Sequence, residues 1–407
     1  MLFRTPDSAW KRSFVLAVVL TAALTACDKN STDASGEPQL RTLDPQLVAQ
    51  GREIFRHDTF GNEVFWTDTA RMHEVIASDV SPALALAVGL KVDADALPQA
   101  VKDAIAAGEV DLDDPAVTVT LLKLNAVVGL HGTVETLDGQ DELIRVGITC
   151  ALCHSHVDNS FAPGIGKRLD GWANTDLDVG AIVALSPAIP EALKAIMRAW
   201  GPGMYDPRIN IDGLNTPIVI PPAYGLHGVS KETFTGDGPV SYWNAYVAVT
   251  QMHGRGAFSD PRLSISVSAD PDLVTSKLPA LAEYQFSLPA PPAPGTADAA
   301  AVTRGEAVFR GPANCADCHI PEQQFTDVGL DRLHAPSATG MNPAYAARTA
   351  TKQYRTTPLR GLWQHPPYFH DGSAATLEAV VAHYNQTLSL GLTAQQRADL
   401  VAYLARL

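Results

Sequence analysis

Two copies of one five-residue motif carry the strongest chemical signal in the 407-residue sequence. They read Cys150-Ala-Leu-Cys153-His154 (the first motif) and Cys315-Ala-Asp-Cys318-His319 (the second motif). Two thiols three residues apart lie on one face of a helical turn, where both can add to the vinyl groups of one porphyrin. The histidine that follows can turn a ring nitrogen toward the iron. The spacing therefore predicts two covalently bound haem c groups, with thioether bonds at all four cysteines and each histidine as an iron ligand.

Two other interpretations of a C-x-x-C pair compete with haem attachment. The pair alone could form a redox-active disulfide or provide half of a zinc site. Two copies, each followed directly by histidine, favour haem over both alternatives. The fifth cysteine, Cys27, lies near the N-terminus and leaves no pair for a structural disulfide.

The N-terminus predicts an export signal. Within residues 1–12, three basic residues against one acidic residue give a net charge of +2, and an apolar run follows over 14–24. That run is about half of the roughly 20 residues that a membrane-spanning helix needs, which is typical of a secretory signal. It ends Leu24-Thr-Ala-Cys27, which resembles the lipobox of bacterial lipoproteins. The resemblance implies cleavage after residue 26 and lipidation of Cys27.

Export agrees with the predicted haems, because haem c is attached on the outer side of the cytoplasmic membrane. We therefore expect a lipid-anchored protein on the periplasmic face of the membrane of a Gram-negative bacterium. Residues 1–26 form the predicted signal, and the polar residues 27–43 form a flexible tether.

Composition predicts a folded chain. Hydrophobic residues make up 46% and charged residues 18% of the sequence, so most of the chain can build a core. The formal net charge of -14 argues against a nucleic-acid partner.

A weak internal repeat suggests how the motifs are positioned. Gly51-Arg-Glu-Ile-Phe55 precedes the first motif, and Gly305-Glu-Ala-Val-Phe309 precedes the second. This pattern resembles the first helix of a cytochrome c domain. About 90 residues separate helix and motif in the first copy, so we expect a helical insertion at about 60–145. Within it, the apolar segment 116–130 is expected to be a buried helix or strand.

The predicted fold is mostly α, with two cytochrome c-like domains and the helical insertion in the first. A Pro-rich linker at 287–301 separates an N-terminal haem c domain at 44–286 from a C-terminal haem c domain at 302–407. Thr393 is a predicted N-cap for the last helix, which resembles the closing helix of a cytochrome c domain.

The run from Arg355 to Ser373, with Thr376 to Asn385, strongly resembles the C-terminal domain of bacterial di-haem cytochrome c peroxidases and MauG-type enzymes. The resemblance is specific over about 300–407 and fainter over 150–265. It implies a peroxide site at the N-terminal haem and an electron relay at the C-terminal haem. It also implies a calcium ion between the domains, at Asn215, Thr356 and Pro358, for which oxygen ligands are suitable. The alternative is that these three residues only shape turns.

The same resemblance places Tyr384 as the sixth ligand of the C-terminal iron. The peroxidases have methionine at this position, whereas MauG-type enzymes have tyrosine. A phenolate is an anionic hard donor and favours oxidised iron. The alternatives are that Tyr384 is a core aromatic residue and that His383 or Met341 binds the iron.

The N-terminal site departs from the family. Lys167 stands where a distal histidine is expected after Ile165-Gly166, Leu263 replaces an acidic residue, and Gly236 replaces a bridging tryptophan. The usual acid–base group for cleaving peroxide is therefore missing, and no catalytic residue is assigned. Three nearby residues could take other roles: Met252 or His253 could bind the N-terminal iron, and Trp243 could bridge the haems or simply belong to the core.

These features predict a di-haem oxidoreductase, peroxidase-like or MauG-like, that uses hydrogen peroxide or oxygen. Its electrons would come from a donor protein or a quinol-linked donor. Two other functions remain open: an electron-transfer cytochrome without catalysis, and a di-haem oxygenase acting on an organic substrate.

Overall fold

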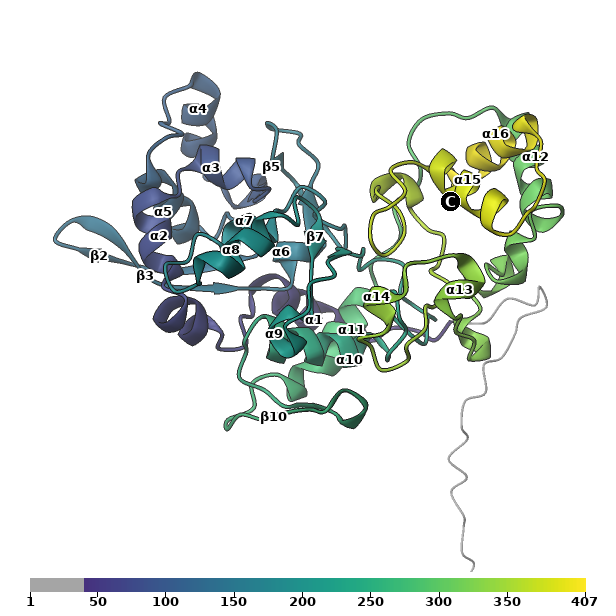
Figure 1. Cartoon of the computed structure of the whole chain (residues 1–407). Coiled ribbons are helices and arrows are strands. Elements are labelled where there is room, and N and C mark those ends of the chain that lie inside the picture. The colour runs from purple at the N-terminus through teal and green to yellow at the C-terminus, as the bar shows by residue number, and fades with distance from the viewer. Residues whose placement is uncertain (1–39) are drawn as a thin grey trace, which may run out of the picture. The chain divides into compact units, whose positions relative to one another are not determined.

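A computed structural model describes residues 40–407 (Figure 1). The predicted signal, Cys27 and the first part of the tether lie outside the described residues. None of the described helices is long and apolar enough to cross a membrane.

The described chain is mostly α-helical, as the sequence predicts. The α-helices are α1 (Pro45–His57), α2 (Met72–Asp79), α3 (Pro82–Ala87), α4 (Gln99–Ala107), α5 (Pro115–Lys123), α6 (Ala151–His154), α7 (Val179–Val183), α8 (Glu191–Arg198), α9 (Ile209–Asp212), α10 (Val240–Tyr246), α11 (Leu278–Phe286), α12 (Ala299–Arg310), α13 (Pro336–Thr339), α14 (Pro343–Ala346), α15 (Leu377–Thr387) and α16 (Ala394–Leu404). Two π-helical segments, η1 (Val64–Thr69) and η3 (Val247–Gln251), complete the longer helical elements.

The strands form only two-stranded sheets. They are β1 (Val92–Asp93), β2 (Leu130–Leu137), β3 (Gln140–Ile148), β4 (Ser155–Val157), β5 (Ile165–Gly166), β6 (Arg168–Asp170), β7 (Met204–Tyr205), β8 (Ile218–Val219), β9 (Phe258–Asp260) and β10 (Ile265–Val267). β1 pairs with β5 in parallel, and the pairs β2–β3, β4–β6, β7–β8 and β9–β10 are antiparallel.

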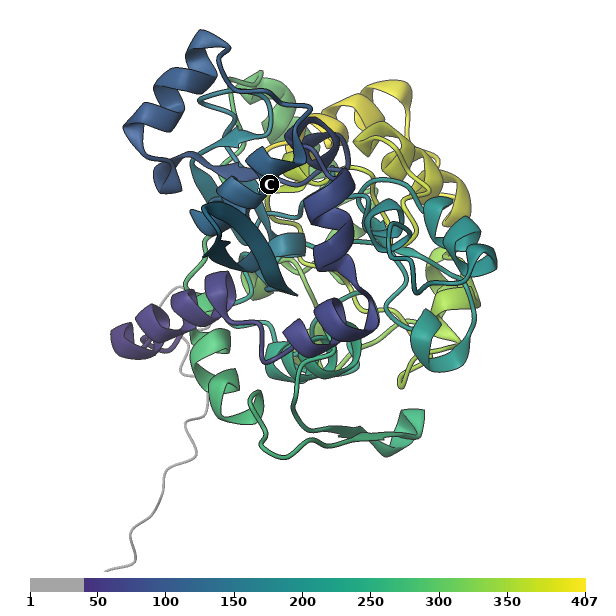
Figure 2. The same cartoon turned by 90° about the vertical axis from the view of Figure 1, so that its left-hand side faces the viewer.

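The repeated sequence pattern forms the same helix pair twice. α1 packs on α11, and α12 packs on α16 (Figures 1 and 2). A β-carbon on Gly51 would lie 1.9 Å from the Ala280 carbonyl oxygen, and one on Gly305 would lie 2.0 Å from the Asp399 carbonyl oxygen. Glycine is therefore what lets each pair of helices approach closely.

Aromatic contacts repeat in the same places. Phe55 and Phe309 are fully buried. Phe55 meets Tyr284 of α11 edge-to-face, with ring centroids 5.4 Å apart, and Phe309 meets Tyr403 of α16 in the same way at 5.3 Å. The last helix begins after Thr393 with a complete capping box, which confirms the predicted cap.

Gly305→Val is expected to lower the free energy of unfolding by about 3 kcal/mol or more, because the new side chain would displace the Asp399 backbone and separate α12 from α16. Chemical denaturation of the purified protein measures the change. Ala307→Val, at an exposed position of the same helix, is the control and should change stability little. Equal stability of the two variants would contradict the proposed close packing.

The insertion is helical only in part, which corrects the sequence-based expectation. The segment 116–130 contains all of α5 except its first residue and ends where β2 begins, and residues 130–148 form the β2–β3 hairpin. Its turn is Asp138-Gly139, with φ of 51° and 83°. Positive φ at both central residues matches the twist of a hairpin, and Asp-Gly is a preferred sequence for such a turn.

The insertion shares its core with the first motif. The hairpin packs on α2 and α5, with Leu143 and Val146 buried. The same buried cluster contains Leu152 of the first motif, and Cys153 packs against it. The insertion is thus part of the surroundings of the first motif.

Residues 287–298 of the predicted Pro-rich linker lie between α11 and α12 and form neither helix nor strand, whereas residues 299–301 belong to α12. Arg406 donates hydrogen bonds to carbonyl oxygens of Ala293 and Pro294, at 3.1 and 2.9 Å. The contacts hold this segment against the end of the chain. The limits proposed for the two haem c domains stay predictions.

Candidate functional site

Each motif forms a short helical turn with buried thiols. The first motif lies on α6, directly after β3, and the second on a 3-10 turn (Cys315–Asp317) after α12. None of the four cysteines in the described residues forms a disulfide. Burial raises the pKa of Cys150 and Cys153 to about 12 and that of Cys315 to about 11. Neutral, buried thiols differ from the low-pKa thiolates of redox-active C-x-x-C pairs.

His154 and His319, the histidines of the two motifs, make the same kind of hydrogen bond. His154 Nδ1 lies 3.1 Å from the Pro221 carbonyl oxygen, and His319 Nδ1 lies 3.1 Å from that of Phe325. A carbonyl only accepts, so Nδ1 carries the proton and Nε2 has its lone pair free. Burial lowers the pKa of both imidazoles to about 4, which keeps them neutral at ordinary pH. A metal-binding histidine typically has this outer hydrogen bond.

Buried donors without partners also fit a haem. Within residues 40–407, Trp243 Nε1, Arg168 Nη1 and Arg355 Nε are buried and have no hydrogen-bond acceptor. Such groups are rare in folded proteins and point to a missing partner. Haem propionates are acceptors of this kind. The residues present therefore fit the predicted cofactor, with thioether bonds at the cysteines and Nε2 of each histidine available to iron.

Tyr384 lies near the second motif. It is on α15, and burial raises its pKa to about 12, with smaller contributions from the Cys315 and Cys318 thiols. His383 is engaged elsewhere, since its Nε2 lies 2.8 Å from the Thr339 carbonyl oxygen. Tyr384 lies beside both thiols of the second motif, and the choice between Tyr384 and His383 as iron ligand stays a prediction.

Met341 belongs to a different part of the core. Its side chain packs against a cluster that contains Ile218, Tyr345 and Tyr354, whereas Cys315 packs against the cluster of Phe309 and Leu400. The neighbouring Gly340 nevertheless faces His383 and Thr387 of α15, so Met341 stays an alternative sixth ligand.

Met252 and His253 both contact the insertion. Met252 is 4% exposed, and its carbonyl oxygen accepts a hydrogen bond from Trp66 Nε1 at 3.1 Å. The His253 ring stacks on Phe65, with centroids 3.6 Å apart and an interplanar angle of 17°. Burial lowers the pKa of His253. Trp243 contacts Tyr242 and Tyr246 edge-to-face.

Three residues stand where the sequence resemblance places the distal groups and the bridging tryptophan. Lys167 is exposed, Leu263 packs against the core, and Gly236 forms a turn with φ of 59°. The sequence-based conclusion that the usual distal groups are missing stays a prediction.

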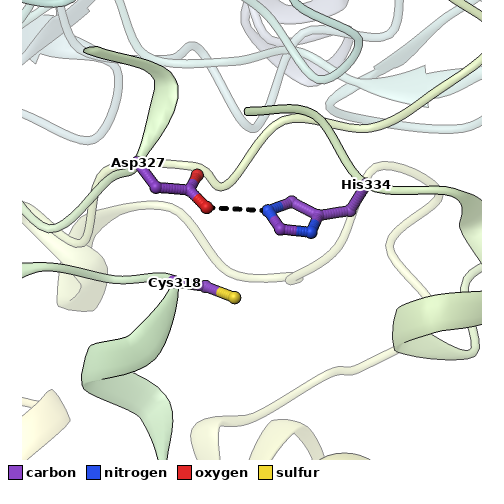
Figure 3. Close-up of side chains that lie close together, drawn as sticks. All are labelled: Cys318, Asp327 and His334. Atoms are coloured by element: carbon purple, nitrogen blue, oxygen red, sulfur yellow. Dashed lines mark hydrogen bonds and ion pairs between the residues drawn. The ribbon is translucent and has the colours of Figure 1, made fainter. Parts of the chain in front are cut away.

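A second cluster near the C-terminal motif was not predicted. Cys318, Asp327 and His334 offer ligand atoms within 4.8 Å of one another, and Asp327 Oδ2 lies 2.9 Å from His334 Nε2 (Figure 3). Asp327 is fully buried, and its other oxygen has no partner in the described chain. The set could hold a metal only with a free Cys318 thiol, so it is not compatible with a thioether there. Nothing in the spacing of these residues reveals the cluster.

The predicted calcium ligands are already hydrogen-bonded. Asn215 Oδ1 accepts a hydrogen bond from Trp200 Nε1 at 2.7 Å, and the Thr356 carbonyl oxygen accepts one from Thr326 Oγ1 at 2.6 Å. On either side of Asn215, the Arg348 guanidinium donates hydrogen bonds to the Leu214 carbonyl oxygen and the Thr216 hydroxyl. We therefore find a poor fit to calcium and derive no function from it.

Arg348 joins several oxygens of the loop at 206–216. Its guanidinium lies 2.7 Å from Asp206 Oδ2, 2.8 Å from Asp212 Oδ2 and 3.1 Å from the Leu214 carbonyl oxygen. It also donates to the hydroxyl of Thr216. The side chains of Arg348 and Asp206 are 4% and 0% exposed. A protein cation thus joins the loop after α14 to the oxygen-rich loop at 206–216.

Arg348→Met is expected to lower the free energy of unfolding by about 3–5 kcal/mol, because it leaves the buried Asp206 carboxylate without its cation. Thermal or chemical denaturation measures the loss. Arg348→Lys should recover only part of it, since lysine lacks the planar fork. A chelator should leave the stability of the native protein unchanged. A large loss on chelation would instead support the calcium site.

Comparisons with known proteins relate a quarter of the chain to haem enzymes. No protein-family model matches the chain. The chain is 34% identical over 127 residues to the methylamine utilization protein MauG of Methylorubrum extorquens. The aligned segment covers 26% of this chain and 33% of that protein. The chain is 30% identical over 147 residues to the cytochrome-c peroxidase IdrP1 of Denitromonas iodatirespirans, which is 26% of this chain and 39% of that protein.

The same share is similar to MauG of Methylophilus methylotrophus, at 32% identity over 120 residues, or 36% of that protein. The chain thus spans between a third and two-fifths of these relatives. The solved structure of a MauG-like protein associated with microbial copper homeostasis also aligns with part of this chain. The alignment covers 36% of this chain and 55% of that protein, at 22% sequence identity. Its TM-score of 0.27 is too low to support an argument. The sequence similarity to MauG and to a cytochrome-c peroxidase is thus limited to about a quarter of this chain.

Proposed function

We propose that the chain is a di-haem c-type cytochrome with peroxidase-like or MauG-like oxidoreductase activity. One observation carries the proposal: both C-x-x-C-H motifs hold a neutral histidine whose Nδ1 donates to a backbone carbonyl and whose Nε2 is free. Two such arrangements, on the repeated Gly–Phe helix plan, match two cytochrome c-like domains. Bound haem would supply redox chemistry and a coordination position for peroxide or oxygen.

We assign the N-terminal haem as the site for peroxide or oxygen and the C-terminal haem as the electron relay. The proposed roles follow the sequence resemblance over 300–407 and the position of Tyr384 near the second motif. Electrons would come from a donor protein or a quinol-linked donor. The N-terminal sequence supports a lipoprotein on the periplasmic face of the membrane.

Buried aromatic side chains between the motifs support communication between them. Burial raises the pKa of Tyr205, with further contributions from Cys153 of the first motif and from Tyr345. Tyr345 stacks on His370, with centroids 6.3 Å apart. The preceding residue, Phe369, meets Tyr384 edge-to-face, with ring centroids 5.8 Å apart. Closely spaced aromatic groups of this kind can connect the two haems in the absence of the family's tryptophan.

The test uses the full-length protein matured with haem. We expect covalent haem at two per chain, a high-spin N-terminal haem that binds cyanide, and oxidation of an added electron donor by hydrogen peroxide. Electronic absorption and electron paramagnetic resonance spectra measure the spin states, and stopped-flow spectroscopy measures the reaction.

The second candidate is an electron-transfer cytochrome without catalysis. It is favoured by the sequence, in which Lys167, Leu263 and Gly236 stand in place of the histidine, the acidic residue and the tryptophan expected from the resemblance. Two low-spin haems in every redox state, with no reaction with peroxide, would establish it and overturn the enzymatic proposal.

A further inference from the structure

The insertion contains an apolar cavity of about 320 Å³. It lies between α3, α4 and α5 and the paired strands β1 and β5. Its walls are almost entirely aliphatic, with Leu86, Ile105, Leu121, Val127 and Ile165 among them. A cavity of this size and lining is at the lower end of the range for small-molecule sites. Apolar cavities stay dry and bind apolar ligands.

One polar group in the wall lacks a partner. Thr118 is 4% exposed, and its hydroxyl makes no hydrogen bond within residues 40–407. Thr120, on the same helix, donates to the Ala116 carbonyl oxygen at 3.0 Å, which is the usual local solution for a helical threonine. An unsatisfied buried hydroxyl is costly, so a ligand atom that bonds to Thr118 would remove the cost.

Helix α4 covers the cavity without belonging to the core. None of its residues is buried, although Val101, Ala104 and Ile105 line the cavity. The helix begins after Pro98 and ends at Gly108, which has φ of 70° and open space around it. Figure 1 shows α4 at the outer end of the insertion. Its apolar face would be completed by a bound molecule.

We propose that this cavity binds a small apolar molecule with one hydrogen-bonding group, such as an aromatic alcohol. The aliphatic walls take the apolar part, Thr118 bonds to the polar atom, and α4 closes the site. Leu121, Val127 and Ile165 belong to the same buried cluster as Leu152 of the first motif. The site thus shares a buried cluster with the first motif, but its ligand binding does not depend on the proposed redox function.

The experiment titrates the holoprotein with 4-fluorobenzyl alcohol and, separately, with fluorobenzene, and follows binding by ¹⁹F NMR. Ala104→Phe places a ring in the cavity and should weaken binding of both probes at least tenfold. Ala106→Phe makes the same change on the exposed side of α4 and is the matched control, with unchanged binding. Circular dichroism confirms that both variants are folded.

Thr118→Val keeps the shape of the side chain and removes the hydroxyl. It should weaken the alcohol about fivefold, the effect of one hydrogen bond, and leave fluorobenzene unchanged. Absence of saturable binding, or equal binding by the Ala104→Phe variant and the native protein, would overturn the site. An unchanged affinity of the Thr118→Val variant for the alcohol would overturn the role of Thr118.

Discussion

Replacing Cys315 and Cys318 together by alanine is expected to halve the covalent haem content of the protein. Each C-x-x-C-H motif supplies its own pair of thioether bonds, so removing one pair should leave the other haem attached. The pyridine haemochrome spectrum and the intact mass of the chain both measure the content.

The matched variant replaces Cys150 and Cys153 and should also retain one haem. The two half-loaded proteins should differ in spectrum, because each keeps a different iron environment. Cys27→Ala is the control and should leave the haem content unchanged. Full haem content after replacement of either cysteine pair would contradict the assignment of one haem to each motif. Zinc in place of haem in the purified protein would contradict it as well.

Features fixed by neighbouring residues could be predicted from the sequence. The Gly51 and Gly305 helices follow from a short local pattern, and Thr393 caps the last helix through a hydroxyl and a glutamine three residues later. The two motifs are equally local, since five residues define the thiols and the histidine. Their hydrogen bonds to Pro221 and Phe325 come from other segments and could not be predicted.

The β2–β3 hairpin had a local signal that the sequence interpretation missed. Asp138-Gly139 lies between two segments that contain valine, threonine, leucine and isoleucine, a common arrangement for a two-residue hairpin turn. The expectation of a wholly helical insertion gave too little weight to this turn.

No short sequence pattern predicts the contacts of Arg348 and Asp327. Arg348 meets Asp206 and Asp212 across more than 130 residues, and Asp327 meets Cys318 and His334 through loops of irregular structure. Such pairs depend on how distant segments pack, which no short pattern encodes. The calcium hypothesis took no account of Arg348 for this reason, because sequence position alone cannot show that another cation lies beside Asn215.

Tyr384→Phe is expected to remove the sixth ligand of the C-terminal iron while leaving both thioether bonds intact. The phenol lies near both thiols of the second motif, and phenylalanine keeps the ring that meets Phe369 at 5.8 Å. Loss of an anionic oxygen donor should open the iron or let another ligand bind, and should raise its reduction potential by on the order of 100 mV. Spectroelectrochemistry measures the potential, and electron paramagnetic resonance reports the change of ligand.

Two matched variants separate ligation from packing. His383→Phe removes the neighbouring imidazole, which already contacts the Thr339 carbonyl oxygen, and should leave the iron spectrum unchanged. Met341→Leu should do the same, because Met341 packs in a separate cluster with Tyr345 and Tyr354. If the Tyr384→Phe protein kept its spectrum and potential, while one of these two variants changed both, the iron ligand would be His383 or Met341 instead. A shift confined to Tyr384→Phe would mark the C-terminal iron as one that favours its oxidised states, as anionic oxygen ligation requires.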